Sequence, residues 1–375
     1  MLIQRSILSD TLFALRNHAC VLIRAAPGSG ATTFCRQLAD RFGSRATLVD
    51  GKDPCLVQVL AVSPAPAGGV CIIDGAGGQT VEFALDALAR TALEENRGRT
   101  TRYALVGGPF PASQGWPLLE LPYFSLFEVG HAAWREHWQR GGLPGAWRAR
   151  DARQALSACR ERLVSVARAV RGQGGRSPSV EATLTIMAMI AASQGQAVNE
   201  LRLAARTGVA RPTVCRLMTR LSDLGLLRAL PAYRPQFPGG RYRTSAAWLW
   251  RDQGLAAAAL SALPDAGEWS TQQSWQAYVV EQAASVLRTG LSPYCFASAD
   301  GAGLDILVAD SGRPVLGAIG RLRPAYATPR GAGNAADALG VQQRFVVTPN
   351  GRGKALTRGF MEVGVVEFLD RVAAL

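Results

Sequence analysis

The sequence contains very little lysine and no long hydrophobic run. Of its 41 basic residues only Lys52 and Lys354 are lysines, and the others are arginines. No stretch approaches the roughly 20 apolar residues that cross a bilayer. The N-terminus also lacks the basic segment, apolar core and cleavage site of a secretory leader. We therefore expect a cytoplasmic protein without a membrane partner.

Cysteine and histidine are sparse and do not form the spacings of metal sites. The seven cysteines are odd in number and include no C-x-x-C pair, so we expect reduced and mostly buried thiols rather than disulfides or a zinc site. The three histidines, His18, His131 and His137, lack ligand spacing. The sequence thus predicts no metal ligand, and no side chain in it is assigned a catalytic role.

Length, apolar content and charge indicate a globular protein that attracts polyanions. With 375 residues, 48% of them apolar, the chain is long enough for two or three domains. The net charge of +13 and the pI of about 10.1 favour a nucleic-acid partner. Because the basic residues are nearly all arginine, a genome-wide coding bias also contributes to this charge, and the charge alone does not decide the partner.

The stretch Val21–Thr33 has the layout of a phosphate-binding loop, with an apolar strand, a turn containing Gly28 and Gly30, and a helix start. In the Walker A pattern G-x-x-x-x-G-K-[ST], backbone N–H groups face the phosphates, the lysine reaches the β- and γ-phosphates and the hydroxyl holds Mg²⁺. Here Ala25 replaces the first glycine and Ala31 replaces the lysine. The alternative is an ordinary strand-turn-helix rich in small residues. If nucleotide still binds, we expect the contacts from four residues: Gly28, Gly30, Thr32 and Thr33.

Two further apolar runs predict parallel strands of the same sheet. Residues 1–20 are expected to form an amphipathic helix, and Val70–Asp74 and Tyr103–Gly108 are expected to be buried strands that alternate with helices. This pattern is typical of a doubly wound α/β sheet. Asp74 stands where a Walker B acid helps to place Mg²⁺, although a structural acid at a strand end fits as well. The next residue is Gly75, where related ATPases often carry a glutamate.

Residues 118–150 carry the features that relate the chain to a known family. The altered loop at 25–33, the stretch Phe124–Glu128 and the segment Trp138–Pro144, which reads W-x-R-G-G-L-P, resemble AAA-type ATPases with a C-terminal DUF4143 domain. The resemblance implies a P-loop ATPase domain over 1–170 and a DUF4143 domain over 251–375, both degenerate. Arg140 lies either at a nucleotide or in a helix cap.

A winged helix-turn-helix is predicted over residues 177–250, after the Gly-rich linker 171–178. Three helices are expected at 182–192, 200–206 and 211–224, followed by a two-stranded wing at 233–242. A DNA reader would use arginines and a threonine of the third helix and the wing: Arg211, Thr213, Arg216, Arg220, Arg241 and Arg243. A protein-docking module is the alternative.

The C-terminal part predicts a second α/β domain that resembles the nuclease-like half of DUF4143. We expect a helix bearing Glu281 and strands at 294–297, 304–308, 314–319 and 344–348. The resemblance implies a metal site with carboxylates at Glu281 and Asp305. The last element of the pattern is missing, because Ala318 and Gly320 supply neither an acid nor a lysine.

Both predicted sites therefore keep residues that shape the fold and lose charged residues that carry chemistry. The expected function is a catalytically degenerate ATPase-like protein that acts with DNA or as a scaffold, with ATP as a weakly held cofactor if any is bound. One alternative is an active ATPase in which Arg24 or Arg36 replaces the lysine. Another is a protein-interaction module with a protein partner or a second copy of itself.

Overall fold

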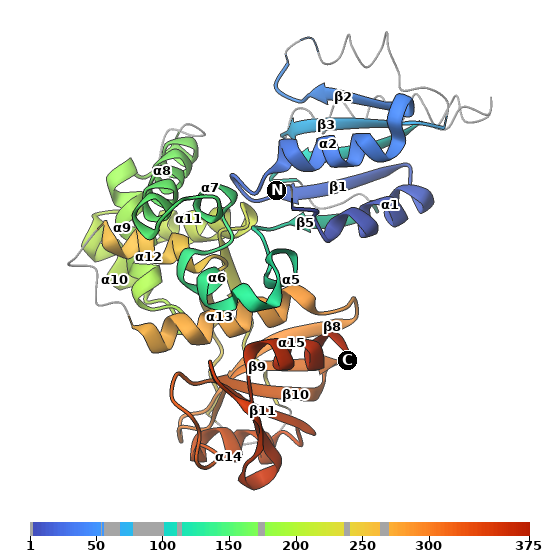
Figure 1. Ribbon diagram of the computed structural model, residues 1–375. Coiled ribbons are helices and arrows are strands. Elements are labelled where there is room, and N and C mark those ends of the chain that lie inside the picture. Colours follow the sequence, from blue (N-terminus) through green and yellow to red (C-terminus); the bar gives the residue numbers. More distant parts are fainter. Residues whose placement is uncertain are drawn as a thin grey trace. The chain divides into compact units, whose positions relative to one another are not determined.

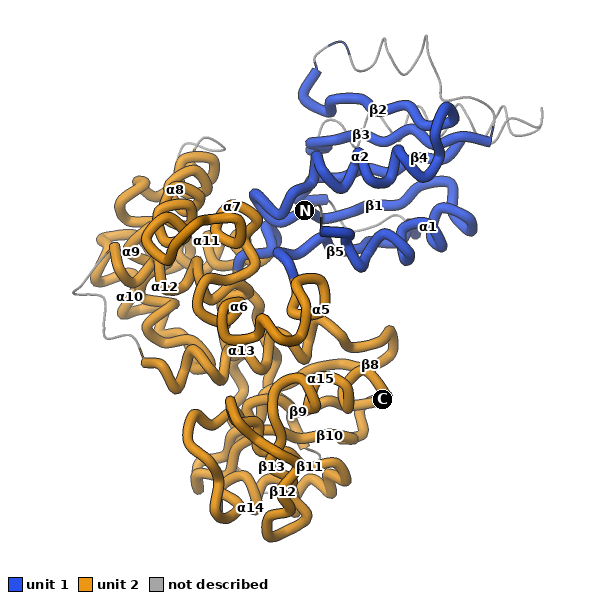
Figure 2. The backbone as a smooth tube through the Cα atoms, in the orientation of Figure 1, with its two compact units in different colours: residues 1–124, 223–226 blue, residues 125–222, 227–375 orange. Residues whose placement is uncertain are grey.

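The computed structural model describes residues 3–53, 55, 68–77, 101–110, 115–171, 177–235, 241–262 and 270–375. The chain divides into two compact units (Figure 2), which we describe separately. Unit 1 comprises residues 1–124 with 223–226, and unit 2 comprises residues 125–222 with 227–375. No helix among the described residues combines the length and the apolarity needed to cross a bilayer.

Unit 1 contains a parallel five-stranded sheet in the order β2-β3-β4-β1-β5 (Figure 1). Because all strands run in one direction, their carboxyl ends meet at one edge, where ligands of such sheets bind. Its elements are α1 (Ile7–Asn17), β1 (Cys20–Ala25), α2 (Ala31–Phe42), η1 (Gly43–Arg45), β2 (Ala46–Asp50), β3 (Val70–Ala76), β4 (Arg102–Gly107) and β5 (Leu118–Leu121).

Helices α1 and α2 cover one face of this sheet and bury Leu15, Phe34 and Leu38 against β1, β3 and β4. A second buried cluster, which includes Leu22, lies on the opposite face. The helical stretch expected between β3 and β4 falls on residues 78–100, outside the described residues. The parallel sheet is confirmed, whereas its second helical layer stays a prediction.

Three details of unit 1 differ from the expectation. The first helix spans Ile7–Asn17 rather than residues 1–20, and Arg5 before it is used in a buried contact described below. Strands β2 and β5 are not predicted, because both are short and carry few consecutive apolar residues. Unit 1 also ends at residue 124 instead of 170.

Unit 2 begins with helices that pack on one another. They are α5 (Leu126–Val129), η2 (His131–Ala133), α6 (Trp134–Arg140), α7 (Pro144–Trp147), α8 (Ala152–Arg171), α9 (Val180–Ala192), α10 (Glu200–Thr207), α11 (Arg211–Asp223) and α12 (Gln253–Ser261). Helix α12 packs on both α8 and α9. The expected linker 171–178, of which 172–176 lie outside the described residues, joins α8 and α9 within unit 2, and the expected domain bounds stay predictions.

The described residues of the expected wing segment 233–242 contain no strand pair of their own. The paired antiparallel strands are β6 (Leu227–Leu230) and β7 (Ala247–Trp250), which flank the predicted segment 233–242 on both sides. Residues 236–240 of that segment are outside the described residues. On the two sides of residues 236–240, Ala232 forms a β-bridge to Cys295 and Tyr242 forms a β-bridge to Ser298.

The rest of unit 2 is a six-stranded mixed sheet in the order β12-β13-β11-β10-β9-β8, with α13 and α15 on one face and α14 on the other (Figure 1). Its elements are α13 (Thr271–Val286), β8 (Leu291–Ala297), β9 (Gly303–Asp310), β10 (Arg313–Gly320), α14 (Arg330–Ala338), β11 (Gln343–Val347), β12 (Arg352–Ala355), η4 (Thr357–Gly359), β13 (Phe360–Val363) and α15 (Val365–Ala373). The four predicted strands are confirmed as β8 to β11.

Candidate functional site

The loop between β1 and α2 has the backbone of an anion site. Gly28 and Gly30 adopt φ of +82° and +91°, a region that favours glycine. Helix α2 begins directly after Gly30, which provides no side-chain cap. The first intrahelical bond runs from the Phe34 N–H to the Gly30 carbonyl, at 2.9 Å. Within the described residues, the N–H groups of Thr32 and Thr33 before it have no acceptor, as expected of an uncapped first turn.

Two side chains fix the direction in which the loop peptides point. Arg5, 4% exposed, donates to the carbonyl of Ser29 at 2.7 Å and to that of Pro122 at 2.5 Å. The Tyr123 hydroxyl donates to the carbonyl of Pro27 at 3.2 Å. In a trans peptide the carbonyl and the following N–H point in opposite directions. The N–H groups of the two loop glycines are therefore turned away from these braces and remain available to a ligand.

The charge expected beside such a loop is missing. Ala31 occupies the first position of α2, so position 31 has no ammonium to contact a phosphate. Arg24 is partly buried and pairs with Glu120 of the neighbouring strand β5. Arg36 lies exposed on the second turn of α2. Among the described residues, Ser29 adds a fully buried hydroxyl without a hydrogen-bond partner.

Asp74 lies at the end of β3, close to the start of α2. Burial raises the pKa of the Cys35 thiol, and the neighbouring Asp74 carboxylate raises it further. Gly75 has φ +77°, and a Cβ on Gly107 would lie 2.2 Å from the Ala76 carbonyl oxygen, so neither position admits a larger side chain without strain. Two charged side chains lie at the same sheet edge: a Cβ on Gly75 would be 3.9 Å from an Asp50 carboxylate oxygen and 3.4 Å from the Lys52 Cε.

The predicted DNA-reading residues of α11 lie on its accessible side. Arg211 and Arg216 are exposed, and Thr213 and Arg220 are partly buried. The Arg211 guanidinium pairs with Glu200 of α10 at 2.9 Å, and Arg216 donates to the Thr213 hydroxyl at 3.0 Å. Both arginines are thus oriented by neighbours on the same pair of helices.

The two predicted wing arginines differ. Arg241 is exposed. Arg243 is partly buried, and its guanidinium donates to the carbonyls of Ser245 at 3.0 Å, Gly195 at 3.3 Å and Ala246 at 3.2 Å. Three of the five N–H donors of Arg243 are thus used by backbone carbonyls, and its contact with a phosphate stays a prediction.

Glu281 is not in the predicted metal site. It is 4% exposed and pairs with Arg228 at 2.5 Å and with Arg251 at 2.8 Å. Arg228 lies on β6, and Arg251 directly follows β7. Burial by itself would raise the pKa of Glu281, but the two arginines hold it below its usual value. The assignment of Glu281 next to Asp305 is wrong, because the carboxylate is used in an ion triad.

Asp305 on β9 has a different partner on α13. Its carboxylate accepts from the Gln276 amide at 3.1 and 3.2 Å and from the Gly320 N–H at 2.8 Å. Gln276 and Glu281 are five positions apart, about 140° around a helix, so they face different surroundings. Burial raises the pKa of Asp305 despite these bonds. Among the described residues no three His, Cys, Asp or Glu side chains gather to hold a metal.

The segment Trp138–Pro144 has a structural role. The carboxylate of Asp252 accepts from the N–H groups of Gly142 at 2.7 Å and Leu143 at 3.1 Å, and it also caps α12. Burial raises the pKa of Asp252 to about 6, and the backbone N–H groups act against that rise. Arg140 pairs with Glu136 on its own helix at 2.9 Å, which favours the cap over a nucleotide contact.

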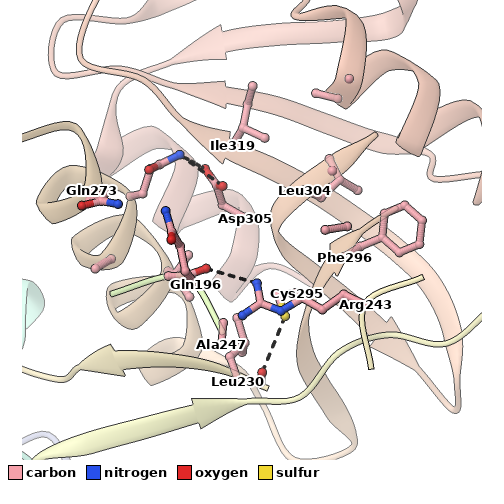
Figure 3. A pocket seen from close by; sticks show the side chains of 18 of the residues that line it. Gln196, Leu230, Arg243, Ala247, Gln273, Cys295, Phe296, Leu304, Asp305 and Ile319 are labelled. Atoms are coloured by element: carbon pink, nitrogen blue, oxygen red, sulfur yellow. Dashed lines mark hydrogen bonds between the residues drawn. The ribbon is translucent and has the colours of Figure 1, made fainter. Parts of the chain in front are cut away.

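A cavity of about 500 Å³ adjoins Asp305 (Figure 3). It lies between the β6–β7 strands, α13, strands β8 and β9, and the start of α14. Sequence reasoning did not find this cavity, because its walls come from segments more than 100 residues apart. It also missed Arg5 and Tyr123 at the loop, and neither has a local sequence signal.

Comparison with known proteins gives limited information. Residues 131–266 match the model of a domain of unknown function, DUF8612. This is not DUF4143, so the DUF4143 resemblance stays a prediction. The chain is 27% identical over 337 residues, 84% of this chain and 73% of the relative, to uncharacterized protein Rv2008c of Mycobacterium tuberculosis. Uncharacterized protein Mb2031c of Mycobacterium bovis matches equally.

Solved structures similar to the chain include P-loop ATPases. The Walker-type ATPase paby2304 of Pyrococcus abyssi has a TM-score of 0.44 at 12% identity, over 69% of this chain and 96% of that one. The RuvB Holliday junction branch migration motor of Thermotoga maritima has a TM-score of 0.31 at 18% identity, over 61% and 90%. Both TM-scores are low, and neither likeness decides what this chain does.

Proposed function

We propose that this chain is a degenerate AAA-type, P-loop-like protein that binds a nucleotide without hydrolysing it and associates with DNA. One observation supports the nucleotide site above all. The β1–α2 loop keeps its phosphate-facing N–H groups unsatisfied and braced from behind by Arg5 and Tyr123, while position 31 carries no cation. A helix N-terminus with free N–H groups attracts phosphate through its dipole and its donors.

The proposal excludes efficient hydrolysis on chemical grounds. Transfer of the γ-phosphoryl group depends on cations that neutralise charge on its oxygens, and on a group that orients the attacking water. Ala31 removes the first cation, and Arg24 is engaged with Glu120. Gly75 and Gly107 supply no polar side chain at the strand ends. Asp74 would contribute one ligand to Mg²⁺, and Asp50 is its neighbour on β2, but Gly75 occupies the position where related ATPases often carry the glutamate.

The test uses opposite charges at position 31. Ala31→Lys should strengthen ATP binding about tenfold to a hundredfold, because a charge-assisted hydrogen bond to phosphate is restored. Ala31→Glu should abolish measurable binding, although glutamate in a first helical turn is favourable for stability. The measurement is titration calorimetry with ATP and Mg²⁺. Ser9→Lys, which adds the same charge on the exposed side of α1, should bind as the wild type does.

Two outcomes would contradict this reading. If neither the wild type nor Ala31→Lys binds ATP at millimolar concentration, the loop is an ordinary turn. Turnover near ~1 s⁻¹, ordinary for enzymes of this kind, that disappears in Thr32→Ala or Asp74→Ala would favour the alternative of an active ATPase.

DNA association is the second part of the proposal, and the surface of α10 and α11 supports it. The helices are joined by the three-residue turn 208–210, with Gly208 at φ +65°, as in a helix-turn-helix. Exposed arginines gather there: Arg202, Arg206, Arg211 and Arg216. We assign α9 to α11 with β6 and β7 to a winged helix, whose third helix would enter a groove of DNA.

Salt dependence tests this part. Wild-type affinity for duplex DNA should fall steeply with salt, and replacing Arg216 by glutamine should flatten the slope of log K against log salt by about one unit if the residue contacts a phosphate. Arg153→Gln, an exposed arginine on α8, is the matched control. If the wild type shows no salt-sensitive binding, or if both variants behave alike, the winged helix is a protein-docking module.

The C-terminal sheet supports descent from a nuclease-like domain of the DUF4143 kind, without its activity. Helix α13 and strands β8 to β11 follow the order expected from the sequence, yet Ala318 and Gly320 on β10 supply neither the acid nor the lysine of the pattern, and the Gly320 N–H donates to Asp305. We expect no Mg²⁺- or Mn²⁺-dependent cleavage of DNA. Cleavage that is lost in Asp305→Ala would contradict this expectation.

A further inference from the structure

The cavity beside Asp305 carries cationic groups at one side. Arg321 and Arg330 line it, and in the described part of the chain neither guanidinium donates a hydrogen bond to another residue. Helix α14 is nine residues long and starts at the cavity without a side-chain cap on Pro329. The N–H groups of its first turn and the two guanidinium groups together form an anion-binding surface.

A buried acceptor at another wall lacks its donor. Gln194 lines the cavity and is 2% exposed, and its Oε1 has no partner within the described residues. Gln253 fixes the orientation of the Gln194 amide. The Gln253 NH₂ group donates to the Trp250 carbonyl at 3.2 Å, so its oxygen is the atom that accepts from the Gln194 NH₂ group at 3.1 Å. The Gln194 oxygen is thus left to accept from a group that enters the cavity.

The remaining walls combine apolar surface with a carboxylate. Phe296, Leu304 and Ile319 belong to one buried apolar cluster and line the cavity, and Asp305 lies beside Ile319, next to α13 (Figure 3). Among the described residues, the Oδ1 atom of Asp305 accepts from Gln276 alone and has capacity for a further donor, whereas Oδ2 accepts from both Gln276 and the Gly320 N–H. The walls therefore offer an apolar surface for a ring and acceptors for amino or hydroxyl groups.

We infer that this cavity binds a nucleoside phosphate, independently of the loop in unit 1. Its phosphate would lie against Arg321, Arg330 and the first turn of α14, its ring against the apolar wall, and its donor groups toward Gln194 and Asp305. A volume of about 500 Å³ suits a ligand of this size. The ligand is either a free mononucleotide or the 5′-phosphorylated end of a single DNA strand. The site binds without cleaving, because Asp305 is its one carboxylate.

The experiment is carried out on the full chain carrying Ala31→Glu, so that the unit 1 loop does not contribute. The probes are the four 2′-deoxynucleoside 5′-monophosphates and a six-nucleotide strand with and without a 5′-phosphate, measured by titration calorimetry. We expect at least one monophosphate to bind. Arg321→Gln combined with Arg330→Gln should weaken it tenfold or more, whereas Arg323→Gln, exposed two residues away from Arg321, should have no effect.

A second variant separates the two ends of the ligand. Gln194→Met should weaken binding of the monophosphate. Competition by inorganic phosphate for the same site should stay unchanged, because only the nucleoside part of the ligand reaches the wall that contains Gln194. Thermal unfolding of each variant checks that it is folded. If the 5′-phosphorylated strand competes with the monophosphate and the 5′-hydroxyl strand does not, the strand end is a ligand. If neither strand competes, the ligand is the free mononucleotide.

The inference is overturned if none of the probes binds at millimolar concentration, or if binding survives Arg321→Gln with Arg330→Gln. It is also overturned if Arg323→Gln weakens binding as much as that double variant. Failure of the unit 1 proposal would show itself separately, as ATP binding that Ala31→Glu leaves unchanged in a chain that also carries Arg321→Gln and Arg330→Gln.

Discussion

The β1–α2 loop of unit 1 and the Glu281 carboxylate on α13 of unit 2 differ in whether their polar groups have partners. At the loop, N–H groups and the Ser29 hydroxyl stay without partners in the described residues. Glu281 pairs with two internal arginines. A buried polar group without a partner is costly and points to a ligand, whereas a satisfied one contributes to structure. We therefore expect binding at the loop and a structural role for Glu281.

The largest effect should come from breaking the ion triad of Glu281. Glu281→Ala leaves Arg228 and Arg251 buried without their carboxylate, so the free energy of unfolding should fall by about 3–5 kcal/mol. Chemical denaturation measures this. Glu367→Ala, which removes a surface pair with Arg371, should change it by less than about 1 kcal/mol. Equal effects of the two variants would show that the triad is not structural.

The second-largest effect on stability should come from Arg5, which donates to the carbonyls of Ser29 and Pro122 behind the β1–α2 loop. Arg5→Met leaves the carbonyls of Ser29 and Pro122 without their donor, at a cost of about 2–3 kcal/mol. ATP affinity should fall as well, because the loop peptides are no longer held in one direction. Arg16→Met on the exposed side of α1 is the control, and its effect should stay within about 0.5 kcal/mol. If Arg5→Met binds ATP normally, the brace does not orient the loop.

Two buried acids of unit 2 should respond to pH in opposite directions. The pKa of Asp252 is raised to about 6, so its favourable contribution is complete below its unfolded pKa near 4 and is lost as pH rises through 6. The size is on the order of 2–3 kcal/mol. The pKa of Glu281 is lowered, so its contribution is present above its unfolded pKa of about 4.5 and is lost as pH falls.

The measurement for Asp252 is its carboxyl ¹³C NMR titration together with denaturation at several pH values. A midpoint near 4 would show that its N–H bonds outweigh the cost of burial. In Asp252→Asn, the fall in stability between pH 4 and 6 should disappear. The variant should be less stable at every pH, because its single amide oxygen can accept either from Gly142 and Leu143 or from Leu255, whereas the two carboxylate oxygens accept from all three.

The smallest expected effect is on turnover. Ala31→Lys restores a cation but not the groups missing at Gly75 and Gly107, so hydrolysis should stay at the background rate while affinity rises. A phosphate-release assay on the wild type and the variant measures this. Turnover that appears with the lysine alone would mean that the sheet edge still holds a working water-orienting group, and the comparison between the two sites would lose its basis.

Much of the fold is predictable because buried parallel strands form continuous apolar runs. Val70–Asp74 and Tyr103–Gly108 predict β3 and β4 in this way, and the runs after residue 290 predict β8 to β11. Units are harder to predict. The Gly-rich stretch near 171–178 is typical of a linker, but the packing of α12 on α8 and α9 overrides that local signal.

The candidate sites are predictable only where the residues are close in the chain. Gly28 and Gly30 share one loop, so their role follows from spacing. Arg5 reaches Pro122 across 117 positions, and Gln276 reaches Asp305 across 29, and nothing in either local sequence indicates these contacts. The resemblance relates Glu281 and Asp305 to one pattern, but the helical phase of α13 turns Gln276 rather than Glu281 toward Asp305, and that phase depends on the helix axis relative to the sheet.

The connection between β6 and β7 has a consequence for self-association. Its residues pair with β8, the outermost strand of the six-stranded sheet, through bonds such as Tyr233 N–H to the Cys295 carbonyl at 2.8 Å and Arg243 N–H to the Ala297 carbonyl at 2.9 Å. The opposite outer strand, β12, is four residues long, fully exposed and carries Arg352 and Lys354. One margin of the sheet is thus covered and the other is short and charged, two known defences against edge-to-edge aggregation. A chain shortened between β6 and β7 would expose the β8 margin and form strand-paired aggregates while its interior stayed intact.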